Sequence, residues 1–486
     1  MSSALSARRV AFDTLRAVHD ADAYANLVLP TAIARAQLSP ADAALATELT
    51  YGTLRQQGTW DAVIAVAANR PTETLDPPVL DILRLGVHQL LATRVPPHAA
   101  VNESVALTRA SAGQRAVGFV NAVLRRIGGA DAATWISRAE EAARSDDERL
   151  SVRTSHPVWV IRALRRALDD EGRAGELTDL LAADNDPPRV TMTALPGLAA
   201  IPEGSEPTSF SPYGFRAPAG DPGRLVAASG GALRVQDEGS QLAALVLSEV
   251  DPVRPGERWL DLCAGPGGKT ALLAARALEA REVGSPLDLE ANEVSSTRAG
   301  LVRRSLEPIP FEVPVSEEDG RERAGSAAYD RILVDAPCTG LGALRRRPES
   351  RWRKSPQDVA PLAELQGELL SAAVTGLRPG GVVAYVTCSP HLAETRDVVA
   401  AVLDQHRNEL EELDARGVLR RVSRNVPDLA TPGSGGGRAQ LWPHHEHFRV
   451  TFPIRSRSCV RQRSRHDEQL RPPPRPQLGR LVHAPS

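Results

Sequence analysis

Lysine, cysteine and aromatic residues are all scarce in this chain of 486 residues. It contains two lysines, Lys269 and Lys354, four cysteines, and only 4% aromatic residues. Four cysteines are too few for a disulfide framework in a chain of this length, so we expect reduced thiols in a cytoplasmic protein. A net charge of −2 argues neither for nor against nucleic acid, and any nucleic-acid surface must be a local patch.

Long hydrophobic runs are also absent. No stretch approaches the apolar length that spans a bilayer, and the start, MSSALSARRVAFDTL, lacks the apolar region of a signal peptide. We therefore expect no membrane association. The length predicts two or three domains, and an apolar content of 42% is enough for their cores.

The hydrophobic periodicity divides the chain into four parts. Apolar residues recur at intervals of three and four through residues 1–145, which predicts an all-α bundle. Residues 146–228 are rich in Pro, Gly and Ser and predict a small α+β linker domain. Residues 229–454 alternate strands with helices, which predicts an α/β, Rossmann-like domain with a parallel, doubly wound sheet. Residues 455–486 form a basic, Pro-rich tail that we expect to be disordered.

Three of the four cysteines lie in short motifs beside strand-like runs. They are Cys263 in DLCAGPGGKT, Cys338 in DAPCTG and Cys388 in VTCSP. The first motif also contains Lys269, in a chain that otherwise uses Arg for almost all positive charge. A compact ammonium fits a tight loop where a planar guanidinium does not. This clustering of scarce, reactive residues is the clearest sign of chemistry in the sequence.

The glycine-rich loop of DLCAGPGGKT follows a strand and opens a helix. Its glycines let the backbone approach a ligand, and the helix N-terminus offers free N–H groups. The spacing matches neither the P-loop nor the dinucleotide fingerprint. A purely structural turn is the alternative, but a nucleoside-type ligand is the better interpretation. An acid after the next strand would bind ribose hydroxyls, and Glu293 occupies that place.

Asp335, Cys338 and Cys388 each follow a predicted strand. Because parallel strands carry their ligands beyond their carboxyl ends, we expect these side chains to share one crevice with Gly265. A lone buried cysteine is usually inert, but two at strand ends on one face favour a function. A metal site is disfavoured because no CxxC accompanies them. The cluster His444, His445 and His447 is interpreted as a solvated loop, and no metal is expected.

The ordered motifs resemble those of one enzyme family. RVQDEGSQL, DLCAGPGGKT, DAPCTGLGALRRRPESRW and TCSP occur at the spacing of the RNA cytosine-C5 methyltransferases. AAVNESVAL and GFVNAVLRRI are similar to helices of NusB, an RNA-binding factor. The combination resembles the Sun/RsmB-type 16S ribosomal RNA methyltransferases over about residues 6–450. The family often has Glu-Asn-Glu after TCS, where this chain has Glu394-Thr395-Arg396. Near the end of the chain, FRVTFPI is compatible with the final strand that the family has.

The resemblance implies the cofactor S-adenosylmethionine and a set of site residues. It implies Cys388 as the nucleophile on the base, Cys338 as the group that helps remove a proton, and Asp335 and Lys269 as catalytic residues. The implied cofactor-binding positions are Cys263, Ala264, Gly265, Pro266, Gly267, Gly268, Lys269, Glu293, Asp319 and Asp335.

RNA, most simply ribosomal RNA, is the implied partner. In the helical domain Arg8, Arg9, Arg125 and Arg126 are candidate phosphate contacts, with a solvated helix face as the alternative. Two other functions stay open. A methyltransferase acting on transfer RNA is disfavoured by the NusB-like part, and a catalytically silent RNA-binding assembly factor is disfavoured by the presence of both motif cysteines.

Overall fold

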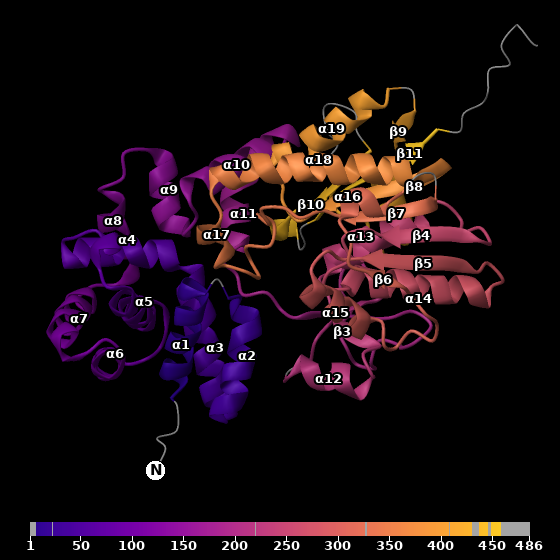
Figure 1. The fold of residues 1–486 in the computed structure, drawn as a ribbon. Coiled ribbons are helices and arrows are strands. Elements are labelled where there is room, and N and C mark those ends of the chain that lie inside the picture. The colour runs from indigo at the N-terminus through magenta and orange to yellow at the C-terminus, as the bar shows by residue number, and fades with distance from the viewer. Residues whose placement is uncertain are drawn as a thin grey trace, which may run out of the picture.

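The computed structural model describes residues 6–457, except 22, 219, 326–327, 408, 430–436 and 446–448. Residues 455 and 456 of the predicted disordered tail belong to strand β11 (Arg449–Ser456), so the predicted start of the tail is wrong by two residues; beyond position 457 the tail lies outside the described residues. A helical lobe and a sheet-containing lobe lie side by side (Figure 1), which confirms the predicted fold class. None of the described helices is long and apolar enough to cross a membrane.

The helical lobe is built from the first nine helices. Their starts follow local signals: the Ser39 hydroxyl accepts from the backbone N–H of Asp42, and Pro40 and Pro77 occupy first-turn positions. Buried aliphatic side chains pack around Trp60 and Trp135. The helices are α1 (Ala7–Asp20), α2 (Ala25–Ala36), α3 (Pro40–Arg55), α4 (Gln57–Ala68), α5 (Pro77–Ala92), α6 (Pro97–Ser111), α7 (Gln114–Ile127), α8 (Ala132–Glu140) and α9 (Asp146–Thr154), with the short η1 (Thr72–Thr74) after α4.

A small helix-and-strand region connects the two lobes. Three short strands form an antiparallel sheet in the order β2-β1-β3, with Met192 and Phe215 in its core. The elements are α10 (Val158–Asp170), η2 (Ala174–Glu176), α11 (Leu177–Ala183), β1 (Thr191–Ala194), β2 (Gly214–Arg216), α12 (Pro222–Ala228) and β3 (Leu233–Val235). Buried side chains of helix α10 belong to the same hydrophobic core as residues of the large sheet, so this region shares a core with the neighbouring domain.

The large sheet of the second lobe has the order β10-β11-β8-β7-β4-β5-β6, and β9 pairs with β11. Strands β8, β7, β4, β5 and β6 run parallel, as the alternation of strands and helices predicts. Their carboxyl ends therefore meet at one edge. The strands are β4 (Glu257–Asp261), β5 (Leu287–Asn292), β6 (Val315–Ser316), β7 (Tyr329–Asp335), β8 (Leu377–Thr387), β9 (Leu410–Glu412), β10 (Ala439–Leu441) and β11 (Arg449–Ser456).

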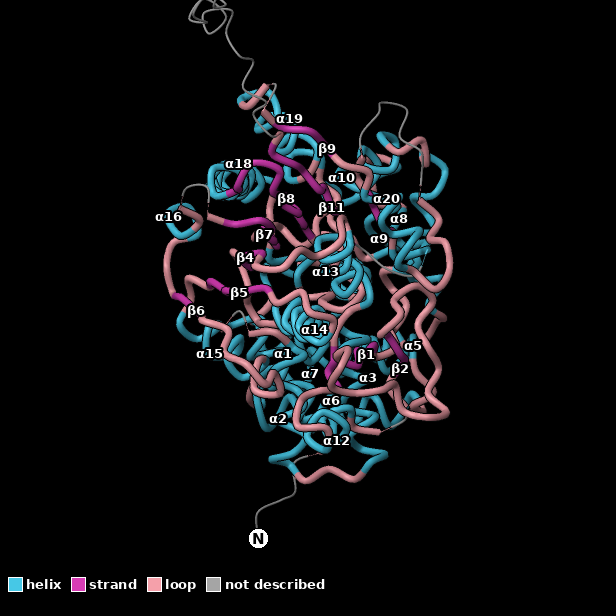
Figure 2. Tube along the Cα trace, turned by 90° about the vertical axis from the view of Figure 1, so that its right-hand side faces the viewer, coloured by secondary structure: helices cyan, strands magenta, loops and turns pink. Residues whose placement is uncertain are grey.

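Helices cover both faces of this sheet. Successive residues such as Trp259 and Leu260 of β4 point to opposite sides and enter two separate hydrophobic cores. Figure 2 shows α18 and α13 on opposite sides of the strands. The helices are α13 (Glu238–Glu249), α14 (Gly268–Glu282), α15 (Ser296–Ser305), α16 (Gly320–Arg323), α17 (Ser350–Arg353), η3 (Pro356–Asp358), α18 (Val359–Gly376), η4 (Leu392–Glu394), α19 (Arg396–Gln405), α20 (Ala415–Val422) and η5 (Pro443–His445).

The sheet is mixed rather than wholly parallel. Residues 449–454 of FRVTFPI belong to β11, which pairs antiparallel with β8 over Val450–Arg455 and with β10. These added strands occupy the side of β8 away from β7, so they leave the carboxyl ends of β4, β5 and β7 open to a ligand. The expected final strand is therefore present.

Candidate active site

The motif residues meet at the carboxyl edge of the parallel strands. Asp261 ends β4, Glu293 follows β5, Asp335 ends β7 and Cys388 follows β8. Cys338 lies three residues after Asp335. The sheet order places β7 between β4 and β8, so the loops after these three strands are neighbours. The strand-end loops that the sequence predicts to meet are therefore neighbours, and the roles of their residues stay predictions.

Cys338 and Cys388 face one another. Their Sγ atoms lie 3.2 Å apart, and both side chains are half-buried. The hydrogen bond with Cys388, together with burial, raises the pKa of the Cys338 thiol well above its usual value. Two thiols at this distance cannot both ionise easily, because the second negative charge would face the first. The pair is therefore suited to carry one thiolate and one thiol.

Glu394 joins the two cysteine loops. One carboxylate oxygen accepts from the backbone N–H of Thr339 at 2.7 Å, and the other accepts from the hydroxyl of Ser389 at 2.5 Å and from that of Thr339. Thr339 follows Cys338 directly, and Ser389 follows Cys388. Gln366 of α18 adds a further hydrogen bond to Glu394 at 3.3 Å. The fully buried carboxylate thus fixes the residues next to both thiols.

Lys269 reaches from the start of α14 to the end of β7. Its Nζ lies 2.6 Å from Asp335 Oδ2, and its side chain is 7% exposed. Asp261 lies next to this pair and accepts from the Thr270 hydroxyl at 2.7 Å. Burial raises the pKa of Asp261 to about 7, and the nearby charge of Asp335 acts in the same direction. Lys269 therefore neutralises part of the negative charge of the crevice.

The glycine-rich loop fits tightly against its surroundings. A Cβ on Gly265 would lie 2.2 Å from Glu293 Oε2, and the Gly265 N–H donates to that oxygen at 3.1 Å. Gly267 has φ 103°, and a Cβ there would lie 2.1 Å from Ser305 Oγ. Only glycine fits both positions without displacing a neighbour. The close approach of backbone and carboxylate leaves the loop no room for larger side chains.

A cavity of about 250 Å³ opens beside this loop. Of the predicted cofactor positions, it is lined by Cys263, Gly265, Glu293, Asp319 and Asp335. Ala264, Pro266, Gly267, Gly268 and Lys269 lie in the same loop or at the start of α14 but do not line the cavity. Its wall also contains residues that the sequence motifs did not single out: Leu262, Asn292, Val294, Arg298, Gly320, Arg321, Pro337, Leu365 and Leu369.

The acidic residues of the cavity are held by defined partners. Glu293 is 3% exposed and pairs with Arg298 at 2.7 Å, while its second oxygen binds the Gly265 N–H. Asp319 caps α16 by accepting from the Arg321 N–H at 3.0 Å, and the Arg321 side chain lowers the pKa of Asp319 to about 2. Glu293 and Asp319 could be found from the sequence because each follows a strand. Arg298 and Arg321 lie in no motif or strand end that would single them out.

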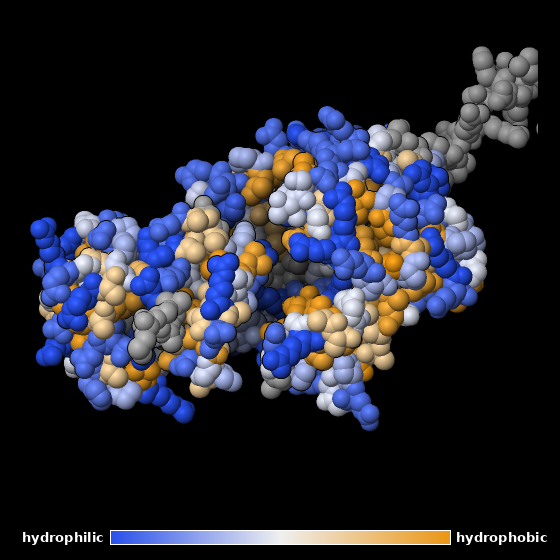
Figure 3. All heavy atoms as spheres, turned by 60° about the horizontal axis from the view of Figure 1, so that its bottom comes forward, coloured by the Kyte–Doolittle hydropathy of each residue, from blue (hydrophilic) through white to orange (hydrophobic). Residues whose placement is uncertain are grey.

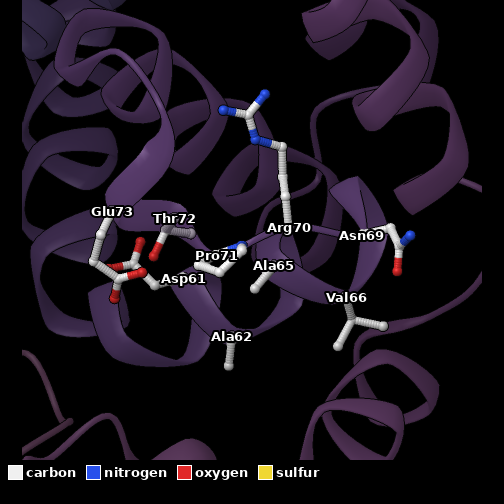
Figure 4. A pocket seen from close by; sticks show the side chains of 9 residues that line it. All are labelled: Asp61, Ala62, Ala65, Val66, Asn69, Arg70, Pro71, Thr72 and Glu73. Atoms are coloured by element: carbon white, nitrogen blue, oxygen red, sulfur yellow. The ribbon is translucent and has the colours of Figure 1, made fainter.

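A second hollow lies in the helical lobe, between the end of α4 and η1 (Figure 4). Asp61 and Glu73 line it, and Arg84 donates to both oxygens of Asp61 at 2.7 Å. Figure 4 shows the Arg70 guanidinium pointing away from these carboxylates. Asp61 is paired with Arg84, and the described lining residues gather no cluster of cations for RNA phosphate, so this hollow is not a candidate for the predicted partner.

The histidine cluster differs from its prediction. The His444 side chain is 6% exposed, and its Nε2 lies 2.8 Å from Glu176, so the predicted solvated loop is wrong at this position. Glu176 also lies 3.0 Å from His445 Nε2 and is bonded to Arg173. These three side chains could hold a metal only by displacing the Arg173 guanidinium, which lies 3.1 Å from His445. His447 lies outside the described residues.

The four candidate arginines of the helical lobe occupy different settings. Arg8 donates to Gln89 at 2.6 Å, and Arg9 pairs with Asp13 at 2.9 Å. Arg125 and Arg126 are exposed, although Arg126 donates to the Ala67 carbonyl at 2.8 Å. The exposed pair on α7 is the better placed for a phosphate, and a role for all four stays a prediction.

The fold and the site together define an S-adenosylmethionine-dependent methyltransferase fold: a parallel sheet, a glycine-rich loop after β4, an acid after β5 and a cavity between them. Residues 249–453 match the family described as 16S rRNA methyltransferase RsmB/F, and residues 5–128 match the NusB family. The chain belongs to the RsmB/F family of RNA methyltransferases, with a NusB domain at its N-terminus.

Individual relatives agree with this assignment. A Mycobacterium tuberculosis protein named as a methyltransferase is 47% identical over 444 residues, covering 90% of this chain and 93% of the relative. Ribosomal RNA small subunit methyltransferase B of Pseudomonas syringae is 33% identical over 427 residues, covering 85% and 90%. The solved structure of PH0851 has a TM-score of 0.75 at 21% identity, covering 94% of this chain and all of that chain, so the shared fold extends over nearly all of this protein.

Proposed function

We propose that this protein transfers a methyl group from S-adenosylmethionine to carbon 5 of a cytosine in 16S ribosomal RNA, through a covalent cysteine adduct. The separation of 3.2 Å between Cys338 and Cys388 Sγ carries the proposal. Carbon 5 of cytosine is a poor nucleophile, so this reaction needs one group that adds to the ring and a second that removes a proton. Two facing thiols at a ligand edge meet both needs.

Cys388 is the proposed nucleophile, as the family resemblance of its TCS motif implies. Its thiolate bonds to carbon 6, and the electron pair of the 5,6 double bond makes carbon 5 nucleophilic. S-adenosylmethionine supplies the electrophilic methyl group when it is bound. Once Cys388 is bonded to carbon 6 it carries no charge, so Cys338 can lose its own proton to solvent and, as a thiolate, take the proton from carbon 5. The double bond then reforms, and the bond from Cys388 Sγ to carbon 6 breaks and returns Cys388 as a thiolate. The base must leave its stack to reach both sulfur atoms.

Asp335 is proposed to bind the target base, and Lys269 is proposed to orient Asp335. A carboxyl at Asp335 faces the edge of the cytosine ring that contains nitrogen 3, and a proton shared there stabilises the adduct. The Lys269 ammonium, 2.6 Å from Asp335, fixes the orientation of that carboxyl. The carboxyl is therefore placed before the substrate arrives, which favours catalysis.

The cavity beside the glycine-rich loop fits a nucleoside-containing cofactor. Gly265 and Gly267 leave no space for a Cβ, as expected where a backbone lies close to a ligand. Glu293 is proposed to bind the ribose hydroxyls and Asp319 a polar edge of the base. Apolar side chains from α18, Leu365 and Leu369, form a wall suited to an aromatic ring.

Site-resolved mapping of 16S ribosomal RNA tests the proposal. Bisulfite sequencing should find one cytosine protected in cells that contain the protein and converted in cells that lack it. The purified protein should restore that mark when it is given S-adenosylmethionine. A mark found on transfer RNA, or no mark with normal RNA binding, would instead favour one of the two other functions. The cytoplasmic location stays a prediction.

A further inference from the structure

Residues 345–354, here called the interdomain strip, lie between the helical lobe and the sheet. The strip follows the Cys338 loop, and the backbone N–H of Gly342, just before it, donates to the Cys388 carbonyl at 2.8 Å. The loop that leads into the strip is therefore bonded to the backbone of Cys388. Its helix α17 lies between the two lobes (Figure 1), and Figure 3 shows a hollow between the lobes with hydrophilic side chains on its rim.

One side of the strip is anchored in the protein. Arg351 is fully buried, and its guanidinium donates to the backbone carbonyls of Arg55 at 2.9 Å and Asp184 at 2.8 Å. Arg353 donates to the carbonyl of Val18 in α1 at 3.0 Å. These bonds join the segment after the Cys338 motif to the helical lobe and to the connecting region. Buried hydrogen bonds to a charged group are strong, so the strip has a fixed position.

The other side of the strip presents cations and an aromatic ring. Arg347 is exposed, and its guanidinium carbon lies 4.8 Å from the ring centroid of Tyr24 at the start of α2. The guanidinium of Arg353 lies 5.0 Å from the same ring, and Tyr24 itself is 38% exposed. Interleaved arginines and an accessible aromatic ring are typical of surfaces that bind single-stranded nucleic acid.

Arg345 extends this cationic surface toward the sheet-containing lobe. Burial lowers the pKa of Arg345, the carboxylate of Asp186 raises it, and the guanidinium of Arg346 lowers it. Its Nε donates to the backbone carbonyl of Asp186 at 3.2 Å. Among the described residues neither Arg345 nor Arg347 forms an ion pair. Carboxylates act on both arginines from a distance, Asp186 on Arg345 and Glu349 on Arg347, without pairing directly with them. Both guanidiniums can therefore still bind an anionic ligand.

We propose that the interdomain strip holds the RNA strand immediately beside the target cytosine. Arg345 and Arg347 bind its phosphates, and Tyr24 stacks on a flanking base. The strip starts at the cysteine loops, so a strand lying on it delivers the neighbouring nucleotide to the two thiols. This inference rests on the proposed RNA substrate, and it assigns to the junction of the two lobes a role that neither lobe has alone.

Salt-dependent binding of a 16S ribosomal RNA fragment tests the strip. The double variant Arg345→Gln, Arg347→Gln should bind more weakly, and its slope of log affinity against log salt should fall by about 1.4, since each lost single-strand phosphate contact contributes about 0.7. The matched control is Arg378→Gln, Arg407→Gln, which removes two charges at the opposite end of β8 and after α19 and should leave the slope unchanged. Cofactor affinity should be normal in both.

A second variant covers the case in which the double variant fails to fold. Tyr24→Leu keeps an apolar side chain but removes the aromatic ring that would stack on a base, so RNA affinity should fall about tenfold. An unchanged slope and affinity in these variants, while the wild type still makes methylcytosine, would overturn the strip and leave the proposed function standing. A wild type that binds RNA but forms no adduct and no methylcytosine would overturn the proposed function instead.

Discussion

Lys269 Nζ lies 2.6 Å from Asp335 Oδ2, which ties the start of α14 to the end of β7 in the active-site crevice. Removing one partner of a largely buried ion pair leaves the other charge without compensation. We predict that Lys269→Gln lowers single-turnover methyl transfer by about tenfold or more. Lys269→Arg should not restore it, because the planar guanidinium does not fit the place of a compact ammonium. Lys354→Gln, at the other lysine, should keep the wild-type rate at saturating RNA.

Glu394 is predicted to position both thiols. Glu394→Ala should lower turnover by about a hundredfold, the typical cost of a misplacement of about 1 Å at a reacting centre. Glu394→Gln should recover part of the rate, because an amide oxygen still accepts from the Thr339 N–H while its NH₂ donates to the two hydroxyls. Glu257→Gln is the control, since Glu257 is also buried but lies at the amino end of β4.

The outcomes of these glutamate variants separate positioning from general stability. Glu257→Gln should lower the midpoint of thermal unfolding with normal turnover below that midpoint, because Glu257 bonds Arg331 far from the crevice. Normal turnover in Glu394→Ala, with only a lower unfolding midpoint, would show that the hydrogen bonds to Thr339 and Ser389 serve stability alone.

Gly267 is predicted to be required for cofactor binding. Gly267→Ala and Gly284→Ala both place a Cβ at positive φ, 103° and 80°, so each should lose about 1–2 kcal/mol of stability. Only at Gly267 does the new Cβ meet another residue, Ser305 at 2.1 Å, whereas Gly284 faces open space. Calorimetric titration with S-adenosylmethionine should show lost affinity for the first variant and normal affinity for the second. Equal affinities would remove the loop from the cofactor site.

The buried imidazole of His156 should make the free energy of unfolding decrease at acid pH. Burial lowers the pKa of His156 to about 4, and the nearby Arg351 charge acts in the same direction. In the unfolded chain the imidazole titrates near 6.5. The contribution of neutral His156 to the free energy of unfolding is therefore fully present above about pH 6.5 and is lost as the pH falls toward about 4. Relative to His156→Gln, the wild type should lose about 3 kcal/mol of unfolding free energy over that window. Denaturant titrations in which the difference between the two proteins is independent of pH would contradict this.

The crevice could be predicted from the sequence because its parts are local. Asp335, Cys338 and Cys388 lie in short motifs directly after strands, and parallel strands bring their carboxyl ends to one edge. The glycine-rich loop and Glu293 follow from the same rule. Periodicity also predicts the helical lobe, since the apolar positions of each helix recur within the helix itself.

The contacts that hold the crevice in place could not be predicted, because their partners are far apart in the chain. Glu394 and Thr339 are separated by 55 positions, and Arg351 and Arg55 by 296. No local pattern records such pairings. The prediction for His444 failed for this reason. A polar cluster normally lies in solvent, but here His444 is hydrogen-bonded to Glu176, 268 positions earlier, in a half-buried site.

Trapping of a covalent protein–RNA adduct tests most directly the division of labour between Cys338 and Cys388. If Cys388 attacks carbon 6 and Cys338 removes the carbon 5 proton, Cys338→Ala stalls the reaction after attack. Denaturing gels should then show an RNA adduct with Cys338→Ala, and none with Cys388→Ala or with the double variant, while Cys388→Ala still binds S-adenosylmethionine. An adduct with Cys388→Ala but not with Cys338→Ala would reverse the two roles. No adduct in any variant, with both single variants merely slower, would contradict the covalent mechanism.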